Sequence, residues 1–314
     1  MLSRRNLRIK VMQQLYAFEQ MPEQETKSFV KYLHDSIQQT YSCLFYNLYA
    51  FAYACEYVQT DVQIKSAKHL PKTKDKQLST RLYFNPIVQT IINDEFLNKE
   101  LNALKIIPRL DEDIYRPLFI KLAATDEYKA YLTLPEESPI KDDEKILAFY
   151  YKKIVLQDEL FLTQTEDLFP NWSSDRDIVE YNLLNFLKVV SEKATFKLKK
   201  LTAAIEEENE FAKKLFDFTI TNRTQLDDEI KPLLTNWDPE RLAFTDSIIM
   251  RMALAEFLYF HEVPVKVTIN EYLEIAKTYS TPRSSEFING VLDKLLQQLR
   301  ESERLLKTGK GVIE

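Results

Sequence analysis

Four positively charged residues lie within the first ten positions of the chain: Arg4, Arg5, Arg8 and Lys10. No acidic residue precedes Glu19, although the dipole of a helix that starts here favours anions in its first turn by about 0.3–1 kcal/mol each. Arginine stays charged at any working pH and donates paired hydrogen bonds to phosphate. The pattern indicates either a phosphate-binding surface or a solvated leader that precedes the apolar side of a helix.

A second segment, TYSTPRSSEFING (residues 278–290), combines a predicted helix start with a cation and hydroxyl groups. The free amides that follow Pro282 in the first helical turn favour an anion. The two aromatic residues of the segment are suited to stacking on unpaired bases of single-stranded RNA. Periodicity alone is equally consistent with a core position for the second of them. The candidate RNA-binding residues of the segment are Tyr279, Arg283, Ser284 and Phe287.

The glycine content excludes most nucleotide-binding chemistry. The chain has only three glycines, whereas a Rossmann fingerprint and a phosphate-binding P-loop each need several at fixed spacing. Gly290 lies inside a predicted helix, where glycine costs about 1 kcal/mol relative to alanine. We therefore expect another backbone to approach closely at Gly290.

No motif for metal binding or catalysis is present in the sequence. The three histidines are far apart and have no cysteine or carboxylate at metal-ligand spacing: His34, His69 and His261. Runs of acidic residues, such as 206–208, are better explained as helix starts and solvated faces than as catalytic carboxylates. We expect neither an enzyme nor a bound metal or cofactor.

Apolar residues recur at helical spacing along nearly the whole chain, so the predicted fold class is all-α. Prolines separate the predicted helices, and we expect lysine-rich residues 65–76 to form an exposed loop. Aromatic residues crowd the second helix, where we favour core packing over a base-stacking platform. The predicted helices cover residues 3–20, 23–62, 86–104, 113–131, 141–168, 176–201, 206–221, 225–234, 238–261, 269–279 and 282–307. The helix at 269–279 is expected to begin with a capping box of Thr268 and Glu271.

The chain is acidic and carries no membrane-spanning pattern. Its 42 Lys and Arg against 48 Asp and Glu give a formal charge of −6, so any nucleic-acid binding must be local. The longest apolar stretch, residues 43–55, is shorter than the ~20 residues that cross a bilayer. No secretory signal is recognisable at the N-terminus. We expect a cytoplasmic protein that does not bind membranes.

Two parts of the sequence resemble the NusB family of bacterial transcription antitermination factors. The opening SRRNLRIKVMQQLYAFEQ and the closing RLAFTDSIIMRMALAEFLYFHEVPVKVTINEYLEIAKTYSTPRSSEFINGVLDKL carry the resemblance. FAKKLFDFTITNRTQLDDEIKPLLTNW, just before the closing block, looks like the preceding helix pair of the family. The similarity covers roughly residues 3–20 and 211–307, so the chain looks like an enlarged member with a helical insertion.

The resemblance implies two small helical subdomains and a non-catalytic role. It implies binding of the boxA element of ribosomal RNA together with NusE, a small-subunit ribosomal protein, within a transcription elongation complex. By position, the RNA-binding residues of the family correspond to Arg4, Arg5, Arg8, Tyr279, Arg283, Ser284 and Phe287. Tyr16 and Asp246 correspond to positions at or near the partner surface. The loop reads STPR, where many relatives have glycine and an acid, and Asn6 replaces a basic residue. We therefore expect the details of boxA recognition to differ from those of the family.

The resemblance also divides the chain. We expect residues 1–21 to form the first family helix with its basic start, and residues 22–205 to form a helical insertion or an extended N-terminal lobe. Residues 206–308 are expected to form the C-terminal helical subdomain, followed by a tail at 309–314. The sequence leaves the oligomeric state open.

The leading hypothesis is an RNA-binding antitermination factor. The alternative is a non-catalytic protein-binding scaffold that has lost RNA binding. The RNA-targeting domain of some ribosomal RNA cytosine methyltransferases is a third possibility, but it requires a glycine-rich cofactor domain that three glycines cannot build.

Overall fold

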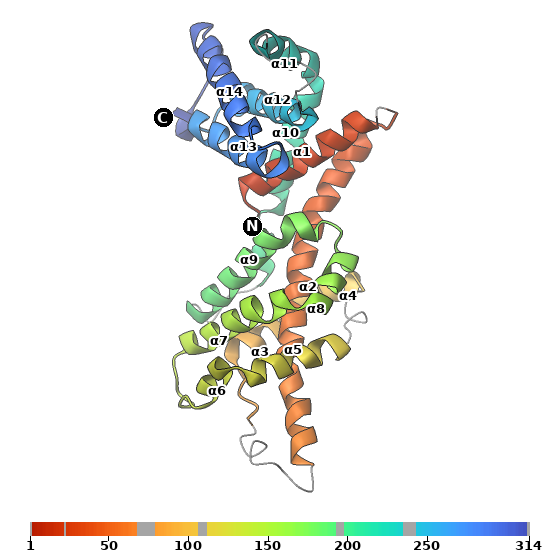
Figure 1. The fold of residues 1–314 in the computed structure, drawn as a ribbon, viewed down its shortest axis with the longest axis vertical. Coiled ribbons are helices and arrows are strands. Elements are labelled where there is room, and N and C mark those ends of the chain that lie inside the picture. Colours follow the sequence, from red (N-terminus) through yellow and green to blue (C-terminus); the bar gives the residue numbers. More distant parts are fainter. Residues whose placement is uncertain are drawn as a thin grey trace. The chain divides into compact units, whose positions relative to one another are not determined.

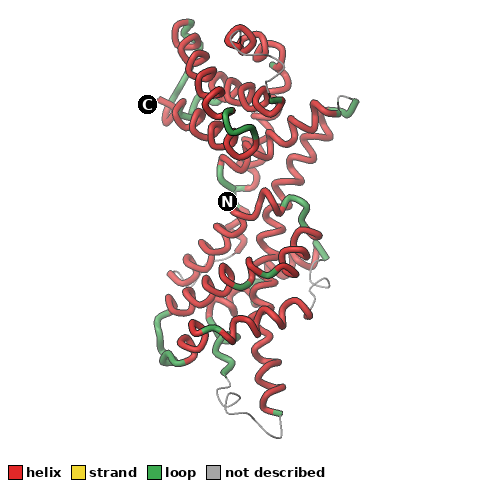
Figure 2. The backbone as a smooth tube through the Cα atoms, viewed as in Figure 1, coloured by secondary structure: helices red, strands yellow, loops and turns green. Residues whose placement is uncertain are grey.

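The computed structural model describes residues 2–21, 23–67, 79–105, 112–192, 198–234 and 243–312. Every regular element in these ranges is a helix (Figures 1 and 2), which confirms the predicted all-α class. Within the described ranges, no helix is both long enough and apolar enough to cross a membrane. The chain divides into two compact units, and the boundary lies inside the long helix α2. Of the exposed loop predicted at 65–76, residues 65 and 66 instead end α2, and residues 68–76 lie outside the described residues.

Unit 2 joins the two ends of the chain, Leu2–Ile37 and Ile205–Glu314. Within it, α1 packs mainly on α10 and also contacts α12 and α13, while α12, α13 and α14 pack on one another (Figure 1). Its elements are α1 (Arg4–Gln20), the first part of α2 (Thr26–Ser66), α10 (Ile205–Thr221), α11 (Arg223–Ile230), η5 (Lys231–Leu234), α12 (Phe244–Tyr259), α13 (Val265–Tyr279), α14 (Ser284–Glu301) and η7 (Gly309–Val312).

Unit 1 is continuous in sequence, Gln38–Ala204, and is built around the remainder of α2. The aromatic residues of α2 support the core prediction, because Tyr46 is fully buried and stacks on Phe161 with ring centroids 6.2 Å apart. The other elements are α3 (Pro86–Ile92), α4 (Glu95–Ala103), α5 (Glu112–Ala124), α6 (Asp126–Leu132), α7 (Ile140–Lys153), η3 (Val155–Gln157), α8 (Glu159–Leu168), α9 (Trp172–Glu192) and η4 (Leu198–Thr202).

Three helices predicted to be continuous, at 86–104, 113–131 and 141–168, are each interrupted. At each interruption a side-chain oxygen accepts a hydrogen bond from a backbone amide of the next helix: Asp94 from Leu97, Thr125 from Tyr128, and Asp158 from Phe161. Such N-caps start a new helix without proline or glycine. Pro117 lies inside α5, within the helix predicted at 113–131.

The division of unit 2 differs from the sequence-based expectation at two places. The first boundary was expected at residue 22, where Pro22 follows the first helix, but residues through Ile37 belong to unit 2. There Phe29 of α2 packs edge-on against Phe18 of α1, with ring centroids 5.3 Å apart. The C-terminal tail belongs to unit 2: it follows Thr308, whose amide donates to the carbonyl oxygen of His261 at 3.0 Å, and Gly311 packs against the same carbonyl group. The predicted helix start at 238–240 lies outside the described residues.

The glycines behave differently from the expectation for Gly290. A methyl group at Gly290 would meet nothing within 4 Å, so no backbone approaches it and that prediction is wrong. The close approach is instead at Gly311, where a Cβ atom would lie 2.0 Å from the carbonyl oxygen of His261. Gly311 therefore allows the tail to pack against the turn that follows α12.

Candidate nucleic-acid interface

Arg8 of the basic N-terminal helix is a core residue of unit 2. Its side chain is 1% exposed and that of Glu256, on α12, is fully buried. The guanidinium donates to both carboxylate oxygens, Nε to Oε2 at 2.8 Å and Nη2 to Oε1 at 2.6 Å. Burial lowers the pKa of Arg8, but the charge and hydrogen bonds of Glu256 outweigh this effect and raise the pKa overall. The expectation that Arg8 contacts phosphate is therefore corrected: the guanidinium is buried and forms an ion pair with Glu256.

Two residues of α13 complete the surroundings of Glu256. Thr268 Oγ1 donates to Oε1 at 2.7 Å, and the hydroxyl of Tyr272 donates to Oε2 at 3.2 Å. α13 begins at Val265, one turn earlier than predicted. The predicted capping box is consequently wrong: Thr268 lies within the helix and bonds Glu256, while Glu271 points to α1.

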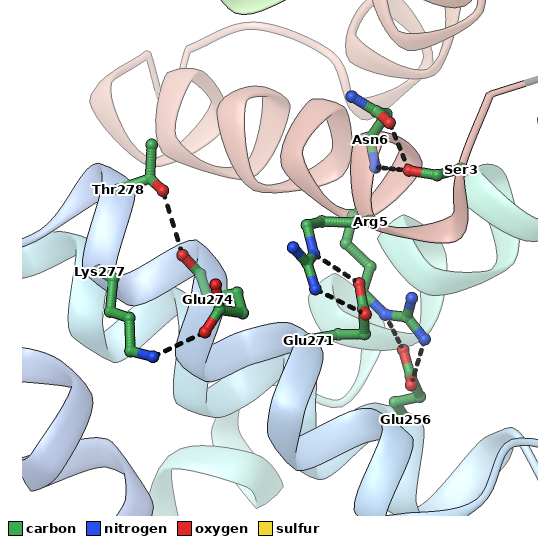
Figure 3. Close-up of polar contacts among 9 residues, drawn as sticks. Ser3, Arg5, Asn6, Glu256, Glu271, Glu274, Lys277 and Thr278 are labelled. Atoms are coloured by element: carbon green, nitrogen blue, oxygen red, sulfur yellow. Dashed lines mark hydrogen bonds and ion pairs between the residues drawn. The ribbon is translucent and has the colours of Figure 1, made fainter. Parts of the chain in front are cut away.

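Arg5 and Glu271 form a second bidentate ion pair, one turn before Arg8 on α1 (Figure 3). Arg5 Nε lies 2.9 Å from Oε2 and Nη2 lies 3.0 Å from Oε1. In contrast with the buried pair, the Arg5 side chain is 43% exposed and that of Glu271 is 21% exposed. Arg5 can therefore be reached by a ligand, but one edge of its guanidinium is already engaged.

Arg4 is the most accessible of the three N-terminal arginines, with half of its side chain exposed. It donates to Glu207 of α10 at 2.9 Å, and its guanidinium carbon lies 4.2 Å from the centre of the Phe211 ring. Ser3 accepts a hydrogen bond from the Asn6 amide and caps the helix (Figure 3). Each of the three arginines thus has a carboxylate partner.

Asp246 of α12 fixes the segment between α13 and α14 by hydrogen bonds to two serines. The carboxylate of this buried residue accepts hydrogen bonds from Ser280 Oγ at 2.5 Å and from Ser284 Oγ at 2.7 Å. Ser284 is itself 2% exposed. The assignments of Ser284 to RNA and of Asp246 to a partner surface are therefore corrected, because the two side chains are buried against each other. Their hydrogen bonds fix the course of the loop.

The other three residues of this segment are at least partly accessible. Arg283 is exposed and immediately precedes α14, while Tyr279 and Phe287 are half-buried. Between this segment and Arg5, α13 carries two acidic residues, Glu271 and Glu274; Glu274 accepts from Lys277 at 2.6 Å (Figure 3). The cationic surface is therefore interrupted by carboxylates and is not one continuous groove.

Tyr16, the other expected partner contact, lies on a small aromatic surface. It is 44% exposed and packs edge-on against Phe244, which is 37% exposed, with ring centroids 5.1 Å apart. In the described residues, no group of three or more potential ligands could hold a metal ion. The arrangement offers binding groups: arginines that are exposed but paired with carboxylates, and aromatic residues that are partly exposed.

Sequence reasoning missed the glutamates that pair with the arginines. A signal existed: Arg5 and Arg8 are spaced i, i+3 on α1, and Thr268, Glu271 and Tyr272 have matching spacing on α13. That spacing places each set on one helix face, but the sequence does not say which faces meet.

Comparison with known proteins gives matches to the C-terminal part of the chain. Residues 179–297 match the NusB family. The chain is 46% identical over 104 residues to the transcription antitermination protein NusB of Salinibacter ruber, which covers 33% of this chain and 65% of that protein. It is 41% identical over 105 residues to NusB of Chloroherpeton thalassium, covering 33% and 50%. It is 43% identical over 83 residues to NusB of Pseudothermotoga lettingae, covering 26% and 59%.

The chain therefore spans about half to two thirds of the length of these relatives. Helix α1, with Arg4, Arg5 and Arg8, lies outside the residues that match the family. No solved structure is significantly similar to the chain.

Proposed function

We propose that the chain is a transcription antitermination protein of the NusB family, which residues 179–297 match, and that it binds boxA-type single-stranded RNA together with NusE. The proposed activity is binding within a transcription elongation complex, without catalysis. A role in transcription places the protein in the cytoplasm. The observation that carries the proposal is the similarity of 46% over 104 residues to an antitermination protein.

Accessibility selects the residues proposed to contact RNA. Arg4, Arg5 and Arg283 are accessible cations that can reach phosphate, and the half-buried rings of Tyr279 and Phe287 can each offer an exposed side to a base. Two buried residues hold the elements of the site in place. Arg8 joins α1 to α12 through Glu256, and Ser284 fixes the loop before α14 through its hydrogen bond to Asp246.

For the protein partner, we propose the aromatic surface of Tyr16 and Phe244. Aromatic residues that are partly exposed and packed on each other are common anchors of protein interfaces.

The test is binding of a fluorescein-labelled boxA RNA, followed by fluorescence anisotropy. Replacing Arg4 and Arg5 by alanine should weaken binding and make it less sensitive to salt, because log K falls by about 0.7 per neutralised phosphate for each unit of log salt. With two or three phosphates contacted, we expect a wild-type slope of about −1.5 to −2. Phe287→Ala should weaken binding by about 1–3 kcal/mol if the ring stacks on a base.

Arg304→Ala is the matched control for Arg5, because Arg304 also forms a bidentate pair with a glutamate and has nearly the same exposure. RNA binding that is independent of salt, or unaffected by all the site variants, would contradict the proposal.

The pairing of all three N-terminal arginines with carboxylates favours a second candidate, a protein-binding scaffold without RNA affinity. Titration of the same RNA with and without NusE separates the two. RNA binding that appears or strengthens with NusE supports the antitermination role, whereas NusE binding with no RNA affinity in either case supports the scaffold.

A further inference from the structure

We propose that Glu271 is an autoinhibitory partner of Arg5, so that an RNA phosphate must displace its carboxylate to reach the guanidinium. The inference rests on the proposed function and concerns the regulation of its RNA site. It assigns to Glu271 a role in setting RNA affinity that is separate from holding the fold.

The geometry of the pair places the carboxylate where a phosphate would bind. Glu271 accepts from Nε and Nη2, the edge of the guanidinium that binds a planar anion with two parallel hydrogen bonds. A phosphate that uses this edge must take the place of the carboxylate. A phosphate that uses the remaining donors would lie close to the negative charge of Glu271.

Accessibility determines which of the arginine pairs RNA can open. The side chains of Arg5 and Glu271 are 43% and 21% exposed, and a pair in contact with water is held weakly. Arg8 and Glu256 are shielded from water, and opening them would leave two buried charges without partners. Competition with RNA is therefore confined to the solvent-facing pairs.

The neighbouring acid strengthens the case for Glu271 in particular. Glu274 is engaged by Lys277 at 2.6 Å, so its charge is partly compensated within α13. In the described residues, Arg5 forms the ion pair of Glu271, and Arg8, whose own partner is Glu256, adds a weaker favourable interaction. Once phosphate engages Arg5, Glu271 loses its ion-pair partner and is left as a negative charge beside the RNA.

The same chain provides a matched pair elsewhere in unit 2. Arg304 donates to Glu229 of α11 through Nη1 at 3.1 Å and Nη2 at 2.8 Å. The side-chain exposures, 42% and 21%, are almost those of Arg5 and Glu271. Glu229→Gln therefore makes the same chemical change as Glu271→Gln, in an equivalent pair that is not part of the proposed RNA site.

The experiment measures binding of fluorescein-labelled boxA RNA and of oligouridylate of equal length to the full chain. Glu271→Gln is expected to tighten binding roughly three- to tenfold at low salt, the size of one charge interaction across about 4 Å of water. The gain should disappear near 1 M salt, where the screening length is about 3 Å. Glu229→Gln should bind RNA like the wild type.

A second variant separates charge from shape. Glu271→Asp keeps the negative charge, and we expect it to bind RNA like the wild type. Thermal unfolding of each variant checks that the fold is retained. A gain in Glu271→Gln with no gain in Glu271→Asp supports competition by charge.

The outcomes distinguish this inference from the function on which it rests. If the wild type binds RNA and Arg5→Ala weakens binding, but Glu271→Gln binds equally or more weakly, Glu271 is not inhibitory and the proposed function stands. If no form binds either RNA, with or without NusE, both proposals are overturned.

Discussion

Arg5 and Arg8 lie one turn apart on the same helix and make the same bidentate contact with a glutamate, yet their surroundings are opposite. Arg8 and Glu256 are shielded from water, while Arg5 and Glu271 face it. Removing one member of a buried pair leaves an uncompensated charge and costs about 3–5 kcal/mol, whereas exposed pairs contribute about 0–1 kcal/mol. A run of arginines in a sequence can therefore contain a core residue and a candidate ligand-binding residue side by side.

The largest expected effect is at the buried pair. Glu256→Ala should lower the free energy of unfolding of unit 2 by about 3–5 kcal/mol, because Arg8, Thr268 and Tyr272 all lose their acceptor. Urea unfolding, together with hydrogen exchange of the α12 amides, measures the change in this unit. A loss below about 1 kcal/mol would mean that Arg8 finds another partner.

The double variant Arg8→Met with Glu256→Leu is the control for this prediction. Neither residue then carries a charge into the core, so the double variant should lose less stability than Glu256→Ala alone. An equal or larger loss would show that packing, and not an unpaired charge, dominates the effect.

A smaller loss is expected for Tyr272→Phe, which removes one hydrogen bond to Glu256 and keeps the ring. Hydrogen bonds to charged groups contribute about 1.5–3 kcal/mol, and we expect the lower end because Arg8 and Thr268 still bond the carboxylate. Tyr259→Phe is the control, since its ring stacks on Phe218 at the edge of the same unit. Equal unfolding free energies for the two variants would contradict a role for the Tyr272 hydroxyl.

The exposed pair should contribute least to stability. Glu271→Gln is expected to lower the unfolding free energy by about 0.2–1 kcal/mol at low salt and by nearly nothing in 1 M salt, where charges are screened over about 3 Å. Chemical unfolding at the two salt concentrations tests this, with Glu229→Gln as the matched variant. If Glu271→Gln lowered the unfolding free energy as much as Glu256→Ala does, the exposed pair would contribute as much to stability as the buried pair, which would contradict the proposed difference between them.

Lys307, a second cation near Glu256 besides Arg8, gives a pH test. Lys307 Nζ donates to the carbonyl oxygens of Glu256 and Phe260, and burial lowers its pKa from 10.5 to about 8. Between these values the unfolded chain binds more protons at this site, so the contribution of Lys307 to stability rises with pH across that interval. Below pH 8 the penalty for burying the charge is fully present.

NMR titration of the lysine side chain should give a midpoint near pH 8 for Lys307. The unfolding free energy of the wild type, relative to Lys307→Met, should rise from pH 8 to pH 10. A midpoint near 10.5 would show that the side chain is solvated like an ordinary lysine. Arg8 offers no such test, because a guanidinium keeps its proton throughout this range.

The sequence predicted the fold class and the course of α1, including its beginning next to Ser3, because apolar periodicity and capping are local properties. It did not predict the helix boundaries at Asp94, Thr125 and Asp158, where one side-chain oxygen starts a new helix. At those positions apolar spacing continues across the break, so periodicity alone gave one helix in place of two.

Within the candidate site, the sequence identified the arginines and the segment 278–290 but not their partners. Glu256 and Glu271 lie about 250 residues or more from Arg8 and Arg5 in the chain, and only the packing of α1 on α12 and α13 brings them together. Gly290 and Gly311 illustrate the same limit: composition cannot tell an open helix face from a place where two backbones meet.

Unit 2 is assembled from the two ends of the chain, and this affects the order of its synthesis and folding. At a ribosome speed of about 5–20 residues per second, α1 emerges roughly 9–40 s before its partners on α10. Until then its apolar face must be shielded by other means, and closing the intervening stretch while it is unfolded costs roughly 4–5 kcal/mol of chain entropy. If residues 38–204 fold first, the flexible loop between α1 and α10 becomes shorter, which lowers the entropy cost of bringing these two helices together.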